Sequence, residues 1–229
     1  MEKIVQLKNV TKIYEGKIKT LALNNINLEI EKGIVCAIYG QSGSGKTTLL
    51  NIMGGLDKPT IGEVIIKNNN ITNLQPDELA IFRNEKIGFI FQFHYLISEL
   101  NILENIIAPV FIRRKGYNYK EAVNKAKELA SILGIENILD KYPDYVSGGQ
   151  RQRVAICRAL INEPELVLAD EPTGNLDSKN TELVVELFFR LNNLKKTTFV
   201  IVTHDLNIAK KCKKMIEIKD GQIIKIIEN

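Results

Sequence analysis

Residues 40–47 form the segment that most constrains the fold of this chain. Their sequence, Gly-Gln-Ser-Gly-Ser-Gly-Lys-Thr, follows an apolar run at 34–39. A helical pattern comes next at 46–53, and Gly54 and Gly55 close it. A strand, a glycine-rich loop and a helix in this order direct backbone N–H groups at a phosphate. This context favours a phosphate-binding loop over a glycine-rich turn with a chance lysine, and it predicts an α/β domain.

The residue types in this loop suit different parts of a nucleotide. Glycine adopts the backbone angles that bring N–H groups to the phosphates, and Lys46 adds a positive charge that makes it a candidate catalytic residue. The Thr47 hydroxyl is placed to bind Mg²⁺. The expected nucleotide contacts of the loop are Gly40, Gln41, Ser42, Gly43, Ser44, Gly45, Lys46, Thr47 and Thr48.

Three further apolar runs read as buried strands, and each ends on polar residues. The runs are 87–91, 166–169 and 199–202, and they are followed by Gln92, by Asp170 and Glu171, and by Thr203 and His204. If these strands are parallel to the strand at 34–39, their ends share one edge of a sheet, which is where open α/β sheets bind ligands. We therefore expect these polar side chains to lie beside the phosphate-binding loop.

Each strand-end residue has a functional and a structural interpretation. Asp170 is expected to hold Mg²⁺ directly or through water, and Glu171 to act as the general base on the attacking water. The alternative for this pair is an exposed acidic turn. His204 is a candidate for contacting the γ-phosphate and orienting Glu171, although a lone histidine is more often structural. Gln92 is a candidate Mg²⁺ or γ-phosphate sensor, or else a surface residue.

A second glycine-containing loop carries no lysine of its own. Ser147 can cap a helix that starts near Gln150, which is the structural interpretation of this segment. A helix N-terminus with adjacent glycine N–H groups is also an oxyanion site. Because the first loop already holds one nucleotide, we predict that Ser147, Gly148, Gly149 and Gln150 contact the γ-phosphate held by another copy of the chain.

Two more residues are candidates for nucleotide or subunit contact. Asp177 is either the N-cap of a helix, a role that Ser178 can also fill, or part of a loop that crosses a dimer interface. Tyr14 is either an adenine-stacking residue or a tyrosine that packs on a hairpin, because the first thirty residues alternate as in an antiparallel hairpin. Between Gln92 and Ser147 the pattern turns helical and Gly134 can end a helix, so we expect an inserted helical part.

Composition sets limits on the class of protein. The 229 residues suit one α/β domain, and the net charge of +4 is too small to indicate nucleic-acid binding. Cys36, Cys157 and Cys212 are expected to be structural thiols, because no two of them have metal-ligand spacing. No run approaches the ~18 apolar residues of a membrane span, and the N-terminus is too charged for a signal peptide, so we expect a cytosolic protein. The basic run Lys210, Lys211, Lys213 and Lys214 predicts a solvated helix face, with contact to anionic lipid as the lesser alternative.

Over nearly all 229 residues the chain resembles the ATPase subunit of ABC transporters. The motifs occur in the family's order: Walker A at 40–47, the Q-loop Gln92, the signature at 146–150, Walker B at 166–171, the D-loop at 175–177 and the switch residue His204. The signature differs from the commonest form only at Val146, where leucine is usual.

The resemblance implies a fold, two cofactors and two kinds of partner. We expect a single domain over 1–229 with a P-loop NTPase core, an N-terminal antiparallel β subdomain and a helical subdomain inserted at about 93–148. It implies a homodimer that closes head-to-tail on ATP and Mg²⁺ and drives integral membrane permease subunits, with no nucleic acid. The ATPase is then peripheral, on the cytoplasmic face of the inner membrane.

Flanking segments narrow the resemblance to one group. Residues 53–60 are similar to the group of exporters and mechanical transmitters that act on periplasmic or surface cargo. Residues 91–96 and 173–177 are most similar to the lipoprotein-releasing ATPases of the Lol type. Macrolide or peptide exporter ATPases, and the cell-division ATPase that moves no cargo, are the alternatives. A DNA-acting type needs a long coiled coil, and a ribosome-acting type usually carries two cassettes; neither fits this chain.

We also expect a groove for a short helix of the membrane partner after Gln92. The alternative is that these apolar residues belong to the core of the helical subdomain. They are Phe93, Tyr95, Leu96, Leu100, Ile102 and Leu103.

Overall fold

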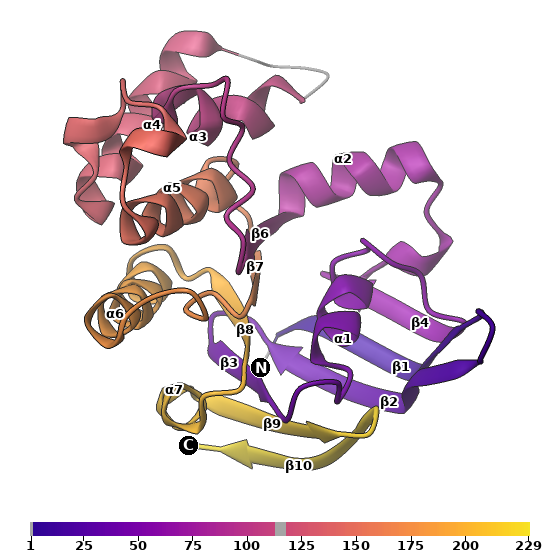
Figure 1. The fold of residues 1–229 in the computed structure, drawn as a ribbon. Coiled ribbons are helices and arrows are strands. Elements are labelled where there is room, and N and C mark those ends of the chain that lie inside the picture. Colours follow the sequence, from indigo (N-terminus) through magenta and orange to yellow (C-terminus); the bar gives the residue numbers. More distant parts are fainter. Residues whose placement is uncertain (1, 113–117) are drawn as a thin grey trace.

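The computed structural model describes residues 2–112 and 118–229 and contains two sheets with helices around them (Figure 1). The strands are β1 (Lys3–Tyr14), β2 (Thr20–Glu31), β3 (Val35–Tyr39), β4 (Ile61–Ile66), β5 (Asn69–Asn70), β6 (Ile87–Phe91), β7 (Leu166–Asp170), β8 (Thr198–Thr203), β9 (Lys214–Lys219) and β10 (Gln222–Glu228). The helices are α1 (Lys46–Met53), α2 (Pro76–Lys86), α3 (Ile102–Phe111), α4 (Tyr119–Leu133), α5 (Gly148–Leu160), α6 (Ser178–Lys195) and α7 (Leu206–Lys211).

The six-stranded sheet has the order β10-β9-β3-β8-β7-β6. Strands β6, β7, β8, β3 and β9 are parallel, and only β10 is antiparallel to its neighbour. The residues of β8 are all buried, because helices or a second sheet cover both faces. The four predicted strands therefore end at one edge of this sheet, as expected.

The four-stranded sheet has the order β2-β1-β4-β5 and is antiparallel throughout. Its two long strands are the predicted N-terminal hairpin. Helix α1 packs between the two sheets, in contact with β2 and β4 on one side and with β7 and β8 on the other.

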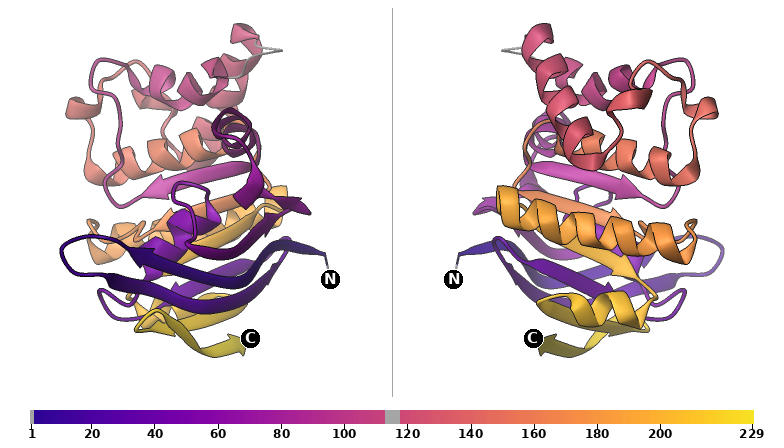
Figure 2. Two further views of the ribbon diagram at one scale, coloured as in Figure 1. Left: turned by 90° about the vertical axis from the view of Figure 1, so that its right-hand side faces the viewer. Right: turned by 90° about the vertical axis from the view of Figure 1, so that its left-hand side faces the viewer.

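The core has two clusters of buried side chains, one on each face of the six-stranded sheet. Along β3, Val35 and Ala37 belong to the first cluster, and Cys36 and Ile38 to the second. Helices α6 and α7 cover the first face (Figure 2), and α1 with the antiparallel sheet covers the second. Fully burying one large apolar side chain contributes about 1.5–3 kcal/mol, so this two-sided burial fixes the strands that carry the site.

The helices α3, α4 and α5 lie together at one end of the molecule, between β6 and β7 in the sequence (Figure 1). Asn118 caps the start of α4, and Gly134 ends it with a left-handed φ of 65°, as its position in the pattern predicts. The limits of the expected insertion at 93–148 stay a prediction.

Lys214 corrects the expectation for the basic run. Lys210, Lys211 and Lys213 are exposed, but Lys214 begins β9 and is buried. Its ammonium lies 3.1 Å from Glu31, at the end of β2, and 3.2 Å from Glu228 of β10, the strand that pairs with β9.

The three cysteines are buried and free of disulfides. Among the described helices, none combines the length and the apolar character that crossing a bilayer requires.

Candidate functional site

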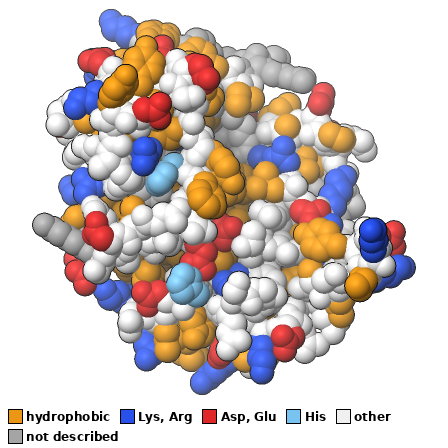
Figure 3. Space-filling view, in the orientation of Figure 1, with side chains coloured by type: hydrophobic (Ala, Val, Ile, Leu, Met, Phe, Trp, Pro, Cys, Tyr) orange, Lys and Arg blue, Asp and Glu red, His pale blue; other side chains and the backbone are white. Residues whose placement is uncertain are grey.

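An open cavity of about 760 Å³ lies at the edge of the six-stranded sheet where its parallel strands end. Its size is that of a site for a nucleotide-sized ligand. In Figure 3, acidic, basic and histidine side chains gather at the hollow on this face of the molecule. The lining residues are Tyr14, Thr20, Leu21, Ala22, Ser42, Gly43, Gly45, Lys46, Thr47, Thr48, Gln92, Glu171 and His204.

Residues of both sheets therefore meet in one place, although they come from distant parts of the sequence. Thr20, Leu21 and Ala22 were not predicted. They belong to the start of β2, and no motif distinguishes them from other residues of a hairpin.

The glycines of the phosphate-binding loop are fixed by close backbone approaches. A Cβ on Gly40 would lie 2.2 Å from the Ile218 carbonyl oxygen. Gly45 has a φ of 102°, and a Cβ there would lie 2.7 Å from the Ala22 oxygen. Alanine at either position would therefore displace backbone rather than a flexible side chain.

The cationic end of the loop belongs to Lys46, the first residue of α1. Its ammonium donates to the carbonyls of Gly40 at 2.9 Å and Gln41 at 2.7 Å, so it lies over the loop. The Ser44 hydroxyl is buried without a hydrogen-bond partner among the described residues. An ammonium and an unsatisfied hydroxyl beside a helix N-terminus fit the phosphates of a nucleotide.

Thr47, which lines the cavity, contacts Asp170 at the end of β7. The Thr47 hydroxyl donates to Asp170 Oδ1 at 3.1 Å. Burial raises the pKa of Asp170, and the charge of Glu171 raises it further. A hydroxyl and a carboxylate are the hard oxygen ligands that Mg²⁺ takes from a protein when substrate phosphates supply the rest. The donor set therefore fits Mg²⁺.

Glu171 and His204 come from the ends of neighbouring strands β7 and β8. His204 Nδ1 lies 2.9 Å from Glu171 Oε2, with the Glu171 side chain 18% exposed and the His204 side chain 70% exposed. An ionised carboxylate can only accept, so Nδ1 carries the proton in this contact. Glu171 has a φ of 43°, and its N–H donates to the Val202 carbonyl at 3.0 Å.

Gln92 contacts the segment that follows Glu171. Its Nε2 donates to Asn175 Oδ1 at 3.3 Å, and Asn175 Nδ2 donates to the Gln92 carbonyl at 3.2 Å. A Cβ on Gly174 would lie 2.9 Å from Gln92 Nε2. The sequence pattern gave no sign of this contact, which joins the end of β6 to the end of β7.

The second glycine loop lies outside the cavity. Ser147 caps α5, which begins at Gly148, close to the predicted start near Gln150. Gln150 N–H donates to Ser147 Oγ at 3.3 Å, and Ser147 N–H donates to Gln150 Oε1 at 2.9 Å. A Cβ on Gly148 would meet nothing within 4 Å, so this helix start is open to an approaching group.

Asp177 is the N-cap of α6, where its Oδ1 accepts from the Asn180 N–H at 2.9 Å. The N-cap interpretation is thus confirmed. The role of Asp177 at a dimer interface stays a prediction, as does the subunit-bridging role of 147–150.

Comparison with known proteins decides the family. The sequence model of the ABC transporter family matches residues 23–174. The chain belongs to the ABC transporter family. The predicted α/β fold of the ABC ATPase type and the predicted enzyme class are confirmed, and this ABC ATPase uses ATP with Mg²⁺.

Relatives that match this ABC protein over nearly its full length include ATP-binding proteins of lipoprotein-releasing systems. The lipoprotein-releasing system ATP-binding protein LolD of Buchnera aphidicola subsp. Schizaphis graminum is 46% identical over 221 residues, which cover 96% of each chain. The LolD protein of Colwellia psychrerythraea is 45% identical over 230 residues, covering 100% of this chain and 88% of the relative.

Solved structures of ABC cassettes match the fold closely. The ATP-binding cassette MJ0796, described as the dimeric post-hydrolysis state bound to ADP and Pi, has a TM-score of 0.90 at 44% identity and covers 98% of each chain. The ADP conformation of MJ1267, an ATP-binding cassette of an ABC transporter, has a TM-score of 0.85 at 29% identity, covering 100% of this chain and 92% of the other.

Proposed function

We propose that this ABC ATPase closes as a head-to-tail homodimer on two Mg-ATP molecules and drives integral membrane permease subunits that release lipoproteins from the inner membrane. The observation that supports this assignment is a sequence identity of 45–46% to ATP-binding proteins of lipoprotein-releasing systems, over nearly the whole chain. The nucleotide site is built as this function requires.

The phosphate-binding loop holds the triphosphate in this proposal. N–H groups of 41–48 would face the phosphates, Lys46 would neutralise their charge, and Thr47 with Asp170 would hold Mg²⁺. An Mg²⁺ ion held there would supply positive charge to stabilise the charge that develops on the phosphates. Gln92 completes this side of the cavity, and its contact with Asn175 gives it a route to sense what the strand ends bind.

Glu171 is the general base and His204 its positioning partner. The 2.9 Å contact with Nδ1 fixes the Glu171 carboxylate at the cavity wall, where it can accept a proton from water. With the proton on Nδ1 in that contact, Nε2 of the neutral ring accepts a hydrogen bond from a water molecule, and Nε2 donates to a γ-phosphate oxygen only when the ring is protonated.

The second loop supports the homodimer. Ser147 is exposed and Gly148 is half-buried at this helix start, where a Cβ on Gly148 would meet nothing within 4 Å, and an oxyanion suits such a position. A two-fold arrangement places this start against the nucleotide of the other copy and gives two identical composite sites. The dimeric state of the matched cassette MJ0796 supports this arrangement.

The exposed aromatic pair Phe93 and Tyr95 is the proposed contact with the permease. Their side chains are 62% and 65% exposed, and their ring centroids lie 6.5 Å apart. Arg158 of α5 donates to the carbonyls of His94 at 2.5 Å and Tyr95 at 2.6 Å. Movement of α5 therefore reaches this surface, which ties the second loop to the membrane partner.

The structure corrects one member of the predicted groove. Ile102 is fully buried in the core of the helical part and cannot contact a partner. Leu96 and Leu103 pack against the same core while remaining partly exposed.

Coupling to the partner is tested at Phe93. Phe93→Glu should lower partner-stimulated ATP hydrolysis at least tenfold in the reconstituted complex while the basal rate of the isolated ATPase stays within twofold. Tyr119→Glu, which alters another exposed aromatic residue of the helical part, is the matched control. Equal stimulation of both variants would reject this surface.

The peripheral position at the cytoplasmic face follows from the proposed partner. Lipoprotein cargo is held in the membrane by acyl chains, and each buried CH₂ contributes about 0.8 kcal/mol. Spontaneous escape is slow, so ATP-driven release is physically reasonable, and the ATPase supplies force without touching the cargo.

The function is tested by depletion of the protein followed by membrane fractionation. We expect outer-membrane lipoproteins to accumulate in the inner membrane, and Glu171→Gln to cause the same defect dominantly through mixed dimers. Correct lipoprotein sorting with lowered drug tolerance would instead identify an exporter, and correct sorting with a septation defect would identify the cell-division type.

A further inference from the structure

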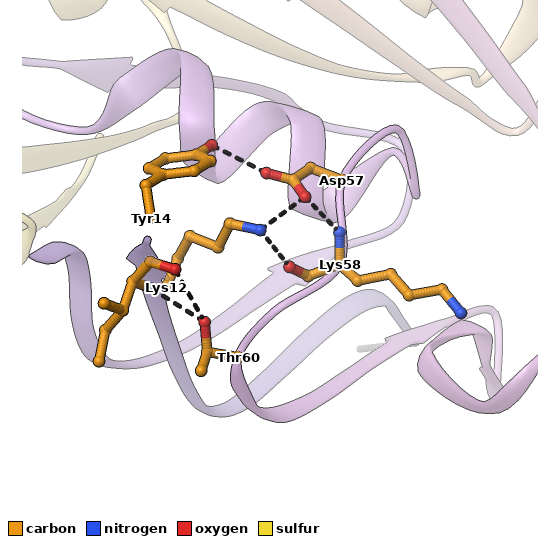
Figure 4. Close-up of polar contacts among 6 residues, drawn as sticks. Lys12, Tyr14, Asp57, Lys58 and Thr60 are labelled. Carbon is orange, nitrogen blue, oxygen red and sulfur yellow. Dashed lines mark hydrogen bonds and ion pairs between the residues drawn. The ribbon is translucent and has the colours of Figure 1, made fainter. Parts of the chain in front are cut away.

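Three residues, Lys12, Tyr14 and Asp57, form a polar cluster at the edge of the cavity, which we call the ring clamp (Figure 4). The Tyr14 hydroxyl donates to Asp57 Oδ2 at 2.8 Å, and the Lys12 ammonium lies 2.6 Å from Asp57 Oδ1. The same ammonium lies 4.8 Å from the centre of the Tyr14 ring and donates to the Lys58 carbonyl at 2.8 Å.

The clamp leaves one side of the Tyr14 ring to the cavity. Tyr14 lines the cavity, whereas Lys12 and Asp57 are not among its described lining residues. The Lys12 side chain is only 12% exposed, while Tyr14 is 42% exposed. A cation over one face is favourable for an aromatic ring and occupies that face. With its hydroxyl held as well, the ring is fixed in orientation.

The clamp also connects the ring to the helix that carries the phosphate-binding lysine. The N–H groups of Leu56 and Asp57 donate to the Asn51 carbonyl of α1 at 2.8 Å and 3.2 Å. Helix α1 begins at Lys46, so Asp57 is attached to the far end of the same helix. The ring and the phosphate-binding loop therefore keep a fixed separation.

A second pair of contacts holds the two segments together beside the clamp. Ile13 N–H donates to Thr60 Oγ1 at 3.0 Å, and Thr60 N–H donates to the Thr11 carbonyl at 2.8 Å. These bonds place β1 alongside the 57–60 turn even without the side chains of the clamp. Changes in the clamp should therefore alter the ring and leave the fold.

The protonation states of Asp57 and Tyr14 agree with the hydrogen bond between them. Burial by itself raises the pKa of Asp57, but the hydrogen bonds from Lys12 and Tyr14 outweigh it and lower this pKa overall. Burial and the bond to Asp57 raise the pKa of Tyr14. At neutral pH Asp57 is thus an acceptor and the Tyr14 phenol a donor, as the contact requires.

We propose that Lys12 and Asp57 are positioning residues that hold the Tyr14 ring as a preformed stacking platform for the purine base of the bound nucleotide. This inference rests on the proposed role of Tyr14 as the base contact. A ring that is ordered before binding spares the nucleotide the cost of ordering it. Because Asp57 is attached to one end of α1 and the phosphate-binding loop lies at the other, the length of α1 sets the distance between the Tyr14 ring and that loop.

The test compares KM with kcat for ATP in variants of the clamp. Lys12→Met and Asp57→Asn should raise KM by roughly three- to tenfold, the cost of ordering one side chain on binding, with kcat within twofold. Lys58→Met is the matched control, because Lys58 contributes only backbone atoms to the cluster and its side chain points away (Figure 4). It should leave both constants unchanged.

Binding of Mg-tripolyphosphate, measured by calorimetry, separates the platform from the phosphate-binding loop. This probe has no base, so both clamp variants should bind it as the unaltered protein does. Equal weakening of ATP and tripolyphosphate would overturn the proposal, because the clamp would then act on the phosphate-binding loop. Thermal unfolding of each variant checks that the fold is retained.

Failure of the clamp and failure of the platform are distinguishable. A raised KM in Tyr14→Ala with unchanged KM in Lys12→Met and Asp57→Asn would overturn the clamp alone. An unchanged KM in Tyr14→Ala would overturn the base contact on which the clamp depends.

Discussion

His204 Nδ1 lies 2.9 Å from Glu171 Oε2, so the histidine at the end of β8 holds the carboxylate at the end of β7. The two residues are separated by 33 positions in the sequence. Because β7 and β8 are parallel neighbours in register, the contact is set by the sheet rather than by a loop. Glu171 is thereby oriented before any ligand binds.

Glu171→Gln should separate binding from chemistry. The amide keeps the shape of the side chain but cannot accept a proton from water, and loss of a positioned base lowers the rate about 10²–10⁴-fold. Mg-ATP binding should persist, and the variant should accumulate as a dimer in size-exclusion chromatography. Turnover at the unaltered rate would show that another group is the base.

Lys46→Ala should abolish ATP hydrolysis without unfolding the protein. Among the described residues, the hydrogen bonds of the ammonium go to carbonyls of its own loop, at Gly40 and Gln41, so we expect the core to persist without it. We expect an unchanged circular dichroism spectrum and a loss of ATP binding by calorimetry. Retained hydrolysis in a folded variant would contradict the role of the loop.

Ser147→Arg should block dimer closure and leave ATP binding to the monomer intact. Ser147 is exposed, caps α5 and lies outside the cavity of its own chain, so in the proposed head-to-tail dimer a bulky cation there should affect only the nucleotide of the other copy. Mixing this variant with Lys46→Ala should place both defects in one composite site and restore part of the activity. Normal hydrolysis by the Ser147 variant alone would refute the head-to-tail arrangement.

Asp170→Asn should stabilise the fold at neutral pH in the absence of Mg²⁺. Burial and the neighbouring Glu171 raise the pKa of Asp170 in the folded state. Stability from binding this proton is complete below the unfolded pKa of about 4 and is lost as the pH rises through the folded pKa. The charged form therefore destabilises the fold at pH 7.

The pH dependence of the effect follows from the direction of this pKa shift. The variant should have a higher Tm than the unaltered protein at pH 7. The difference between the variant and the unaltered protein should vanish near pH 3, where the carboxyl is neutral in both states. A variant less stable at pH 7 would contradict this sign.

The strand ends at the site could be predicted because a buried strand produces a simple pattern in the sequence. Strands covered on both faces read as continuous apolar runs, so the ends at Gln92, Asp170 and His204 were visible in the sequence. The rule that parallel strands end at one edge then gathered these residues. Caps such as Ser147 and Gly134 were visible for the same reason, since each is required locally.

Contacts between distant segments left no such pattern. Tyr14 and Asp57 are 43 positions apart. The sequence around Tyr14 and the sequence around Asp57 do not show that β1 passes the end of α1. The burial of Lys214 depends on Glu31, 183 positions away, so a run of lysines gave the wrong expectation. What the second loop contacts depends on another copy of the chain, and the order of residues within one copy does not carry that information.

The left-handed backbone at Glu171 creates a conflict between ATPase activity and stability to heat. A residue with a side chain is strained at a φ of 43°, by of order 1 kcal/mol, and glycine is not. Glu171→Gly should therefore relax the backbone at the position where the proposed base is removed. A library of this gene selected for heat resistance alone would be expected to enrich inactive members at this codon, so directed evolution of the protein needs a screen for ATP turnover from its first round.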